Sequence, residues 1–161
     1  MKLGYFLSAP KNEQSPLCSL KTTNYLENLL GRDEAKRAGF FEGLWCNTRG
    51  LLAEGTMSNL FFVRAGELYT PSLTCGCMPG TRRALILDSA VSMGIKTHEG
   101  EFERTDLQHA EEVFLTNALM GVMPVARIDN ACFSVAPDGS SSLTRRLEQA
   151  LNITLRESTR A

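Results

Sequence analysis

Lys21 is the first residue whose type and position suggest covalent chemistry. It lies in the segment SLKTTNY, immediately before a predicted helix. Its apolar neighbours Leu17 and Leu20 favour a partly desolvated amine, whose pKa would fall and whose nitrogen would act as a nucleophile. A lysine at such a place is more often a solvated surface charge, and the local sequence by itself favours that second interpretation.

Glu54 is the corresponding carboxylate candidate. It ends a predicted strand in the segment AEGTMSNLF, beside glycine and small polar residues. A carboxylate at this place either caps a turn or faces a cationic ring nitrogen. The composition of the segment does not separate these two roles.

Two segments of small residues are candidates for binding an anion. The segment PGTRR, with Gly80, Thr81 and Arg82 at its centre, enters a predicted helix. Backbone N–H groups at a helix start have no partner within the helix, and a glycine lets an anion approach them, so this segment suits a phosphate. The second segment, TNALMG, carries Asn117 and Ala118 after a predicted strand. Most helix starts and loops bind nothing, so neither segment is specific alone.

Helical periodicity predicts the helices that would position these residues. A helix over residues 22–38 ends at Gly39, and its apolar positions are Tyr25, Leu26, Leu29, Leu30, Ala35 and Ala38. A second helix opens at Pro79-Gly80, and its apolar side is formed by Ala84, Ile86, Leu87, Ala90, Val91 and Met93. A third covers residues 143–155. The spacing from Thr105 to Gln108 is that of a capping box and indicates a short helix near Asp106.

Runs with strand character lie between these helices. Residues 42–48 and 51–54 flank one turn, and residues 60–63 and 68–70 flank another, so each pair is predicted to be a hairpin. Further strands are predicted at the chain start and at residues 112–115 and 122–128. With 161 residues the chain is long enough for one domain. The order of elements predicts an α/β fold of the α+β type rather than a regular βαβ repeat.

Composition excludes several classes of partner. The chain has 17 Lys and Arg and 18 Asp and Glu, for a formal net charge of −1, and no basic run exceeds two arginines. We therefore expect neither nucleic acid nor a membrane as a partner. The apolar runs are far too short to span a bilayer. The apolar stretch at the chain start is interrupted early, unlike a secretory signal, so we expect a cytoplasmic protein.

The cysteines and histidines do not indicate a metal site. The chain has five cysteines and two histidines. The odd cysteine count without repeated spacing indicates reduced thiols. Cys75 and Cys77 have no matching cluster elsewhere in the sequence, so we expect no metal there. His98 and His109 lie in polar contexts and are expected at the surface.

The order of the motifs is more specific than any one of them. Between residues 17 and 128 the chain carries a lysine followed by NYL, then EGxxxNLF, then PGxxR, then EEVFLTNA and a later PV. This series resembles the class IV aminotransferase family, the fold-type IV enzymes that depend on pyridoxal 5′-phosphate. The last predicted helix is consistent with it.

The resemblance implies a role for each candidate. Lys21 matches the lysine that forms a Schiff base with pyridoxal phosphate and then serves as base and acid. Glu54 matches the carboxylate that keeps the pyridine nitrogen protonated, which strengthens the cofactor as an electron sink. Tyr25 falls near a position that lines the ring in some members. The phosphate-binding positions are matched by Gly80, Thr81, Arg82, Asn117 and Ala118.

The same resemblance implies an architecture. We expect the large C-terminal domain of the family, a mixed sheet or pseudo-barrel flanked by helices. Residues 1–20 would form an entering strand and interdomain linker, and residues 21–161 the cofactor-binding domain. Full-length relatives carry an N-terminal domain that gives an arginine to the cofactor phosphate. We expect that domain to be absent here, as a separate fragment or partner or through truncation. Because relatives are dimers, we also expect a homodimer.

The segment NALMGVMPV indicates a subgroup. It resembles aminodeoxychorismate lyases, whereas the aminotransferases usually carry a Gly-Thr or Ser-Thr pair and an EITPV run. Such a lyase forms 4-aminobenzoate and pyruvate from 4-amino-4-deoxychorismate in folate synthesis, and Lys21 would take the proton from the amine-bearing carbon. A branched-chain or D-amino acid aminotransferase is the alternative. A non-catalytic, truncated domain is the second alternative.

Overall fold

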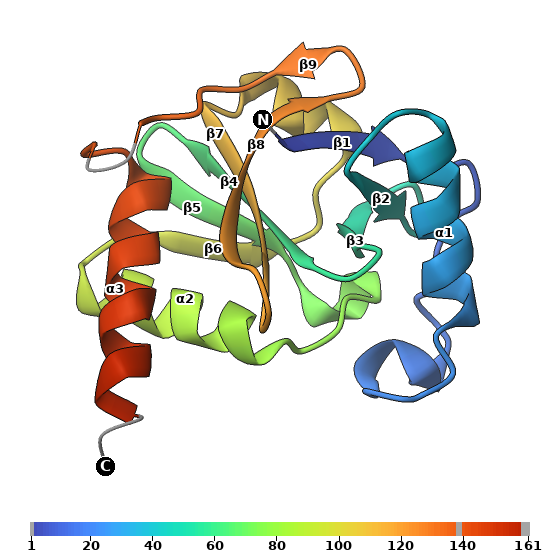
Figure 1. Cartoon of the computed structure of the whole chain (residues 1–161), viewed down its shortest axis with the longest axis horizontal. Coiled ribbons are helices and arrows are strands. Elements are labelled where there is room, and N and C mark those ends of the chain that lie inside the picture. Colours follow the sequence, from blue (N-terminus) through green and yellow to red (C-terminus); the bar gives the residue numbers. More distant parts are fainter. Residues whose placement is uncertain (1, 138–139, 159–161) are drawn as a thin grey trace.

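The strands form one mixed sheet that closes on itself (Figure 1). The computed structural model describes residues 2–137 and 140–158. Along the sheet the order is β3-β2-β1-β8-β7-β4-β5-β6, and β9 pairs with β8. The strands are β1 (Lys2–Phe6), β2 (Glu42–Cys46), β3 (Leu52–Gly55), β4 (Asn59–Arg64), β5 (Glu67–Pro71), β6 (Thr97–Gly100), β7 (Glu112–Asn117), β8 (Gly121–Ile128) and β9 (Ala131–Cys132).

The ring closes at one pair of residues. β3 pairs with β2 on one side and with β4 on the other, and Glu54 opposite Asn59 is the register of the second pairing. The strands from β3 through β2, β1, β8 and β7 to β4 therefore form a closed, barrel-like ring, which confirms the predicted fold. β5 and β6 extend the sheet outside this ring. The expected entering strand, β1, is an inner strand that runs parallel to both β2 and β8.

In the described part of the chain, three α-helices and three 3₁₀ helices flank the sheet. α1 covers Leu26–Arg37 and packs on β1 and β2, whereas α2 (Thr81–Ser92) and α3 (Leu143–Ser158) pack on β7 (Figure 1). The 3₁₀ helices are η1 (Pro16–Ser19), η2 (Leu73–Cys75) and η3 (Arg104–His109). α1 begins four residues later than predicted, at Leu26, and the sequence signals did not reveal β6 or β9.

The strands bury both faces, with alternate residues on opposite sides. On β4, Leu60 and Phe62 belong to the cluster inside the ring, while Phe61 and Val63 belong to the cluster under α2 and α3. Each of these side chains is at most 1% exposed. Successive side chains of a strand point to opposite faces of a sheet, so β4 is buried on both of its faces. The Phe61 ring stacks on Phe114 of β7, with 5.0 Å between ring centres.

The buried side of α1 matches the predicted apolar positions at Ala35 but not at the leucines. The structure buries Gly31 and Ala35, while Leu26, Leu29 and Leu30 are 63%, 53% and 62% exposed. A Cβ on Gly31 would lie 2.8 Å from a Leu7 methyl and 2.9 Å from the Trp45 ring. The helix approaches the sheet too closely for leucine, so its small residues face inward and its leucines face outward.

The structure contains the predicted end of α1 at Gly39 and the predicted short helix near Asp106. Gly39 ends α1 with a φ of +83°, a conformation that glycine adopts without strain. The short helix near Asp106 exists as η3, but its capping box is formed by Glu103 and Asp106 rather than by Thr105 and Gln108. Within the described residues, no helix has the length and apolar character needed to cross a bilayer.

Candidate functional site

A cavity of about 320 Å³ lies beside the pair that closes the ring. Glu54 and Asn59 both line it. Every site residue predicted from the sequence lines it as well: Lys21, Tyr25, Glu54, Gly80, Thr81, Arg82, Asn117 and Ala118. These residues come from segments far apart in the chain, and the cavity volume is within the range of small-ligand pockets.

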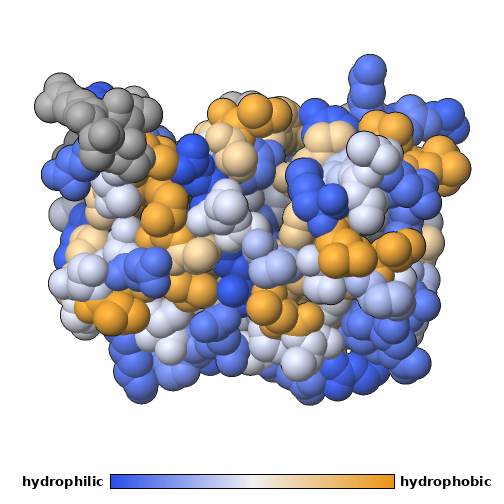
Figure 2. Space-filling model, turned by 90° about the horizontal axis from the view of Figure 1, so that it is seen from below, coloured by the Kyte–Doolittle hydropathy of each residue, from blue (hydrophilic) through white to orange (hydrophobic). Residues whose placement is uncertain are grey.

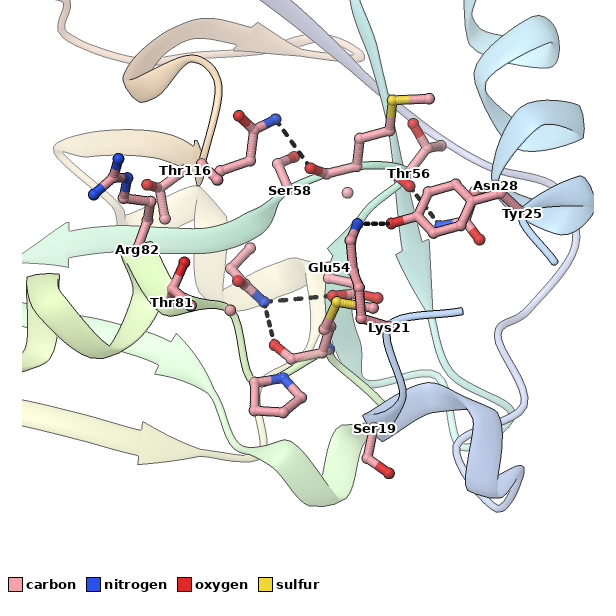
Figure 3. Close-up of a pocket in the computed structure, with 18 residues that line it drawn as sticks. Ser19, Lys21, Tyr25, Asn28, Glu54, Thr56, Ser58, Thr81, Arg82 and Thr116 are labelled. Atoms are coloured by element: carbon pink, nitrogen blue, oxygen red, sulfur yellow. Dashed lines mark hydrogen bonds between the residues drawn. The ribbon is translucent and has the colours of Figure 1, made fainter. Parts of the chain in front are cut away.

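Lys21 reaches the cavity from the segment between η1 and α1. Its Nζ donates to Tyr25 Oη over 2.9 Å and lies 4.7 Å from the centre of the Tyr25 ring (Figure 3). The prediction that Leu17 and Leu20 withdraw this amine from water is wrong, because both leucines are more than half exposed, at 54% and 52%. The Lys21 side chain is itself exposed. Tyr25, rather than an apolar environment, holds the amine in position.

Glu54 is buried and contacted on both carboxylate oxygens. Lys11 Nζ pairs with its Oε1, while the Met78 N–H and Asn59 Nδ2 lie 2.8 Å and 3.4 Å from its Oε2. Burial raises the pKa of Glu54, and the Lys11 ammonium and the Met78 N–H offset part of that rise. The side chain therefore has a fixed orientation at the cavity wall.

The opposite side of the cavity is formed by the start of α2, where Figure 3 shows Thr81 and Arg82. The N-cap is Gly80; no side chain caps this helix end, and its first turn has no acidic residue. A Cβ on Gly80 would overlap the Asn59 side-chain oxygen, so a larger residue here would displace Asn59 or the start of α2. The buried Thr116 Oγ1 and Arg82 Nε have no hydrogen-bond partner among the described residues. Free donors beside an uncapped helix start suit an anion.

Asn117 organises the rim of the cavity with its side chain. Its Oδ1 accepts from the N–H groups of Leu119 and Met120 at 3.0 Å and 2.8 Å. Its Nδ2 donates to the Met57 carbonyl over 3.0 Å, which ties the turn after β7 to the turn after β3. The amide group is thus engaged within the protein. Any anion contact from this turn would come from its backbone.

Asn59, Thr116 and Lys11 were not among the site residues predicted from the sequence; the first two line the cavity, and the third pairs with Glu54. Asn59 donates to the Met78 carbonyl over 2.8 Å and so links the approach to α2 with Glu54. Its place in the EGxxxNLF motif was a usable signal. The local sequence does not indicate the free hydroxyl of Thr116 or the pairing of Lys11 with Glu54, because both depend on contacts between segments that are distant in the chain.

The histidines and cysteines do not line this cavity. His98 lies on β6, stacks on Tyr69 with 4.5 Å between ring centres, and pairs with Glu67 at 2.7 Å. Cys75 and Cys77 are buried, and burial raises the pKa of Cys77 to about 12. Among the described residues, no three His, Cys, Asp or Glu side chains are grouped so that they could hold a metal ion.

The chain is similar to known proteins over most of its length. A family model described as amino-transferase class IV matches residues 2–128. The chain belongs to this family. A branched-chain-amino-acid aminotransferase of Escherichia coli K12 is 35% identical over 127 residues, which are 79% of this chain and 40% of that protein. An aminodeoxychorismate lyase of Bacillus subtilis 168 is 30% identical over 143 residues, which are 88% of this chain and 49% of that protein.

Solved class IV structures share the fold. The branched-chain amino acid aminotransferase of Thermobaculum terrenum, in its pyridoxal phosphate form, superposes with a TM-score of 0.88 at 30% identity, over 96% of this chain and 50% of that chain. This chain thus spans about half or less of the length of these relatives. Class IV enzymes depend on pyridoxal 5′-phosphate, and relatives of both reaction types are similar to this chain.

The residues around the cavity fit that cofactor. The uncapped start of α2 and the free Thr116 hydroxyl suit the phosphate. The Glu54 carboxylate suits a protonated ring nitrogen, and the accessible Lys21 amine suits a carbonyl carbon. These three chemical requirements of one molecule are met around one cavity.

Proposed function

We propose that this chain is the lysine-bearing part of a pyridoxal-phosphate lyase that converts 4-amino-4-deoxychorismate to 4-aminobenzoate and pyruvate. The cofactor assignment rests on one observation: Lys21, Glu54 and the start of α2 all line the same cavity. The free thiols of all five cysteines agree with a reducing, cytoplasmic environment. The expected domain boundary at residue 20 and a homodimeric enzyme remain part of the proposal.

The proposal gives Lys21, Tyr25, Glu54 and the start of α2 separate roles. When bound, pyridoxal phosphate supplies an electron sink for the carbon that bears the substrate amine. Glu54 holds the proton at the ring nitrogen. Lys21 takes the proton from the amine-bearing carbon, and Tyr25 Oη orients its Nζ over 2.9 Å. The backbone N–H groups of Thr81 and Arg82 bind the phosphate.

Covalent labelling tests the cofactor assignment. Incubation with pyridoxal phosphate followed by borohydride reduction is expected to fix the label on Lys21, and Lys21→Ala should lose it. Lys36 and Lys96 are internal controls in the same peptide map, since neither lines the cavity. A label on either control lysine, with Lys21 unmodified, would refute the assignment.

The reaction type rests on the turn at residues 117–120. Its NALM sequence resembles the lyases, and loss of the enolpyruvyl group leaves an aromatic ring, which makes the elimination favourable without a keto acid. In an assembly competent for turnover, 4-amino-4-deoxychorismate should therefore give 4-aminobenzoate and pyruvate with no amino acceptor. Glu54→Gln should retain the fold and lower this turnover, because a neutral amide no longer stabilises the protonated ring.

A branched-chain or D-amino acid aminotransferase is the alternative. It is favoured by the 35% identity to the Escherichia coli aminotransferase, against 30% to the Bacillus subtilis lyase. Amino transfer from leucine or D-alanine to 2-oxoglutarate, without lyase activity, would decide for it. A chain that binds the cofactor but catalyses neither reaction in any assembly would decide for a non-catalytic domain.

A further inference from the structure

Lys11 forms a buried ion pair with the carboxylate that faces the cavity. Its side chain is 9% exposed and that of Glu54 is 6% exposed, and Nζ contacts Oε1 directly. Lys11 does not line the site cavity described above. It lines a second cavity, of about 520 Å³, that also borders on Glu54. Glu54 therefore separates Lys11 from the space proposed for the cofactor.

The backbone fixes Lys11 at this position. Its N–H donates to the Cys46 carbonyl over 2.9 Å, and the residue forms a parallel bridge with Asn47 just beyond β2. The ammonium group also lies 5.2 Å from the centre of the buried Trp45 ring, a cation–π distance. These contacts hold the cation against the wall of the barrel. A surface lysine that turned inward by chance would lack them.

We infer that Lys11 is a positioning residue: it is the counter-cation that keeps Glu54 charged and oriented before a ligand binds. When a ligand with a cationic ring nitrogen is bound, Glu54 interacts with both Lys11 and that nitrogen. A carboxylate this deeply buried is unstable without a positive partner. Of the charged groups that act on Glu54, the Lys11 ammonium favours the charged carboxylate and Glu42 disfavours it. The sharing step rests on the proposed function, whereas the pairing in the ligand-free chain does not.

Two consequences follow for a chain without the Lys11 ammonium. The ligand-free protein loses stability because Glu54 becomes a buried charge with no partner. A ligand that brings its own cation to Glu54 then restores more stability than it adds to the wild type. A ligand that fills only the anion site at α2 restores nothing extra, since it brings no positive charge to Glu54.

Thermal unfolding of the ligand-free chain tests the pairing. Lys11→Met is expected to lower Tm by about 10 °C, since removing one partner of a buried pair is strongly destabilising. Lys11→Arg should keep most of the stability, and Lys11→Met combined with Glu54→Gln should recover most of the loss. A single variant that fails to fold, together with a double variant that folds, supports the same conclusion. A Tm of Lys11→Met within about 2 °C of the wild-type Tm overturns the pairing. A double variant whose loss of Tm equals the sum of the two single losses also overturns it.

Ligand addition tests the sharing. At equal concentration, pyridoxal phosphate should raise Tm more in Lys11→Met than in the wild type, while inorganic phosphate should raise both equally. An equal shift with pyridoxal phosphate overturns the sharing. If pyridoxal phosphate shifts neither protein, the proposed function and the sharing that rests on it fail together, and the double-variant result still decides the pairing.

Discussion

The side-chain oxygen of Asn59 occupies the space that a Cβ on Gly80 would need. Two contacts restrict the Asn59 side chain: its Nδ2 donates to the Met78 carbonyl over 2.8 Å and lies 3.4 Å from Glu54 Oε2. The start of α2 and the closing pair of the ring are thus packed against each other. A change at the anion side of the cavity must therefore disturb the carboxylate side.

Gly80→Ala tests this packing. The φ of Gly80 is −68°, so alanine is not strained there and only the overlap with Asn59 matters. We expect the helix start to shift and the affinity for pyridoxal phosphate to fall by about one to two decades, the loss expected when a charge-assisted contact is misplaced. Titration followed by the fluorescence of Trp45 measures it. Val91→Ala, on the exposed side of α2 at 72% exposure, is the control and should bind normally.

Asn117→Ala tests the rim of the cavity. The substitution removes the one oxygen that accepts from two N–H groups and the nitrogen that donates to the Met57 carbonyl, so the free energy of unfolding should fall by about 2–3 kcal/mol at roughly 1 kcal/mol per hydrogen bond. Chemical denaturation provides the measurement. Leu119→Ala lies in the same turn and is the control, because Leu119 is 95% exposed and its loss should be neutral. Equal stability of the two variants would show that the amide does not organise the turn.

The exposed leucines of α1 predict self-association. Leu26, Leu29 and Leu30 are exposed on the outer side of α1. Figure 2 shows that the face of the molecule seen from below carries apolar groups separated by polar ones. Leu26→Ser with Leu30→Ser should shift the chain from dimer towards monomer in sedimentation velocity. Leu73→Ser, at 47% exposure on η2, is the control. A wild-type chain that is already monomeric at high concentration would contradict the prediction.

Glu67 predicts an acid-dependent loss of stability. Hydrogen bonds from Lys96, His98 and Tyr69 lower the pKa of Glu67 from 4.5 to about 2. A carboxylate with a lowered pKa contributes its stability above the unfolded value of 4.5 and loses it as pH falls towards 2. The difference in urea midpoint between the wild type and Glu67→Gln should therefore shrink progressively as pH falls below about 4.5. Because the Glu67 side chain is partly exposed, at 30%, the difference should also shrink with added salt. A difference that does not change with pH would contradict this assignment.

The sequence by itself determined the family, and it predicted site residues that the structure brings together around one cavity. A helix start, a strand end and a glycine each leave a recognisable pattern within a few positions, and the order of these patterns along the chain made them specific. The segment around Gly80 is an example: it predicted the start of α2, which the structure places at Thr81. The motif order then selected Lys21 and Glu54 from the other lysines and carboxylates, and both line the cavity.

Only the tertiary structure decided which side of α1 is buried and which group accompanies Glu54. The leucine pattern favoured the wrong face because hydrophobicity alone does not reveal how closely a helix approaches a sheet, and at Gly31 that distance excludes leucine. The pairing of Lys11 with Glu54 joins residues 43 positions apart. It exists because the segment before η1 is bridged to the end of β2, and β2 pairs with β3, the strand that carries Glu54. These pairings join segments that are distant in the chain, so no local pattern reveals them.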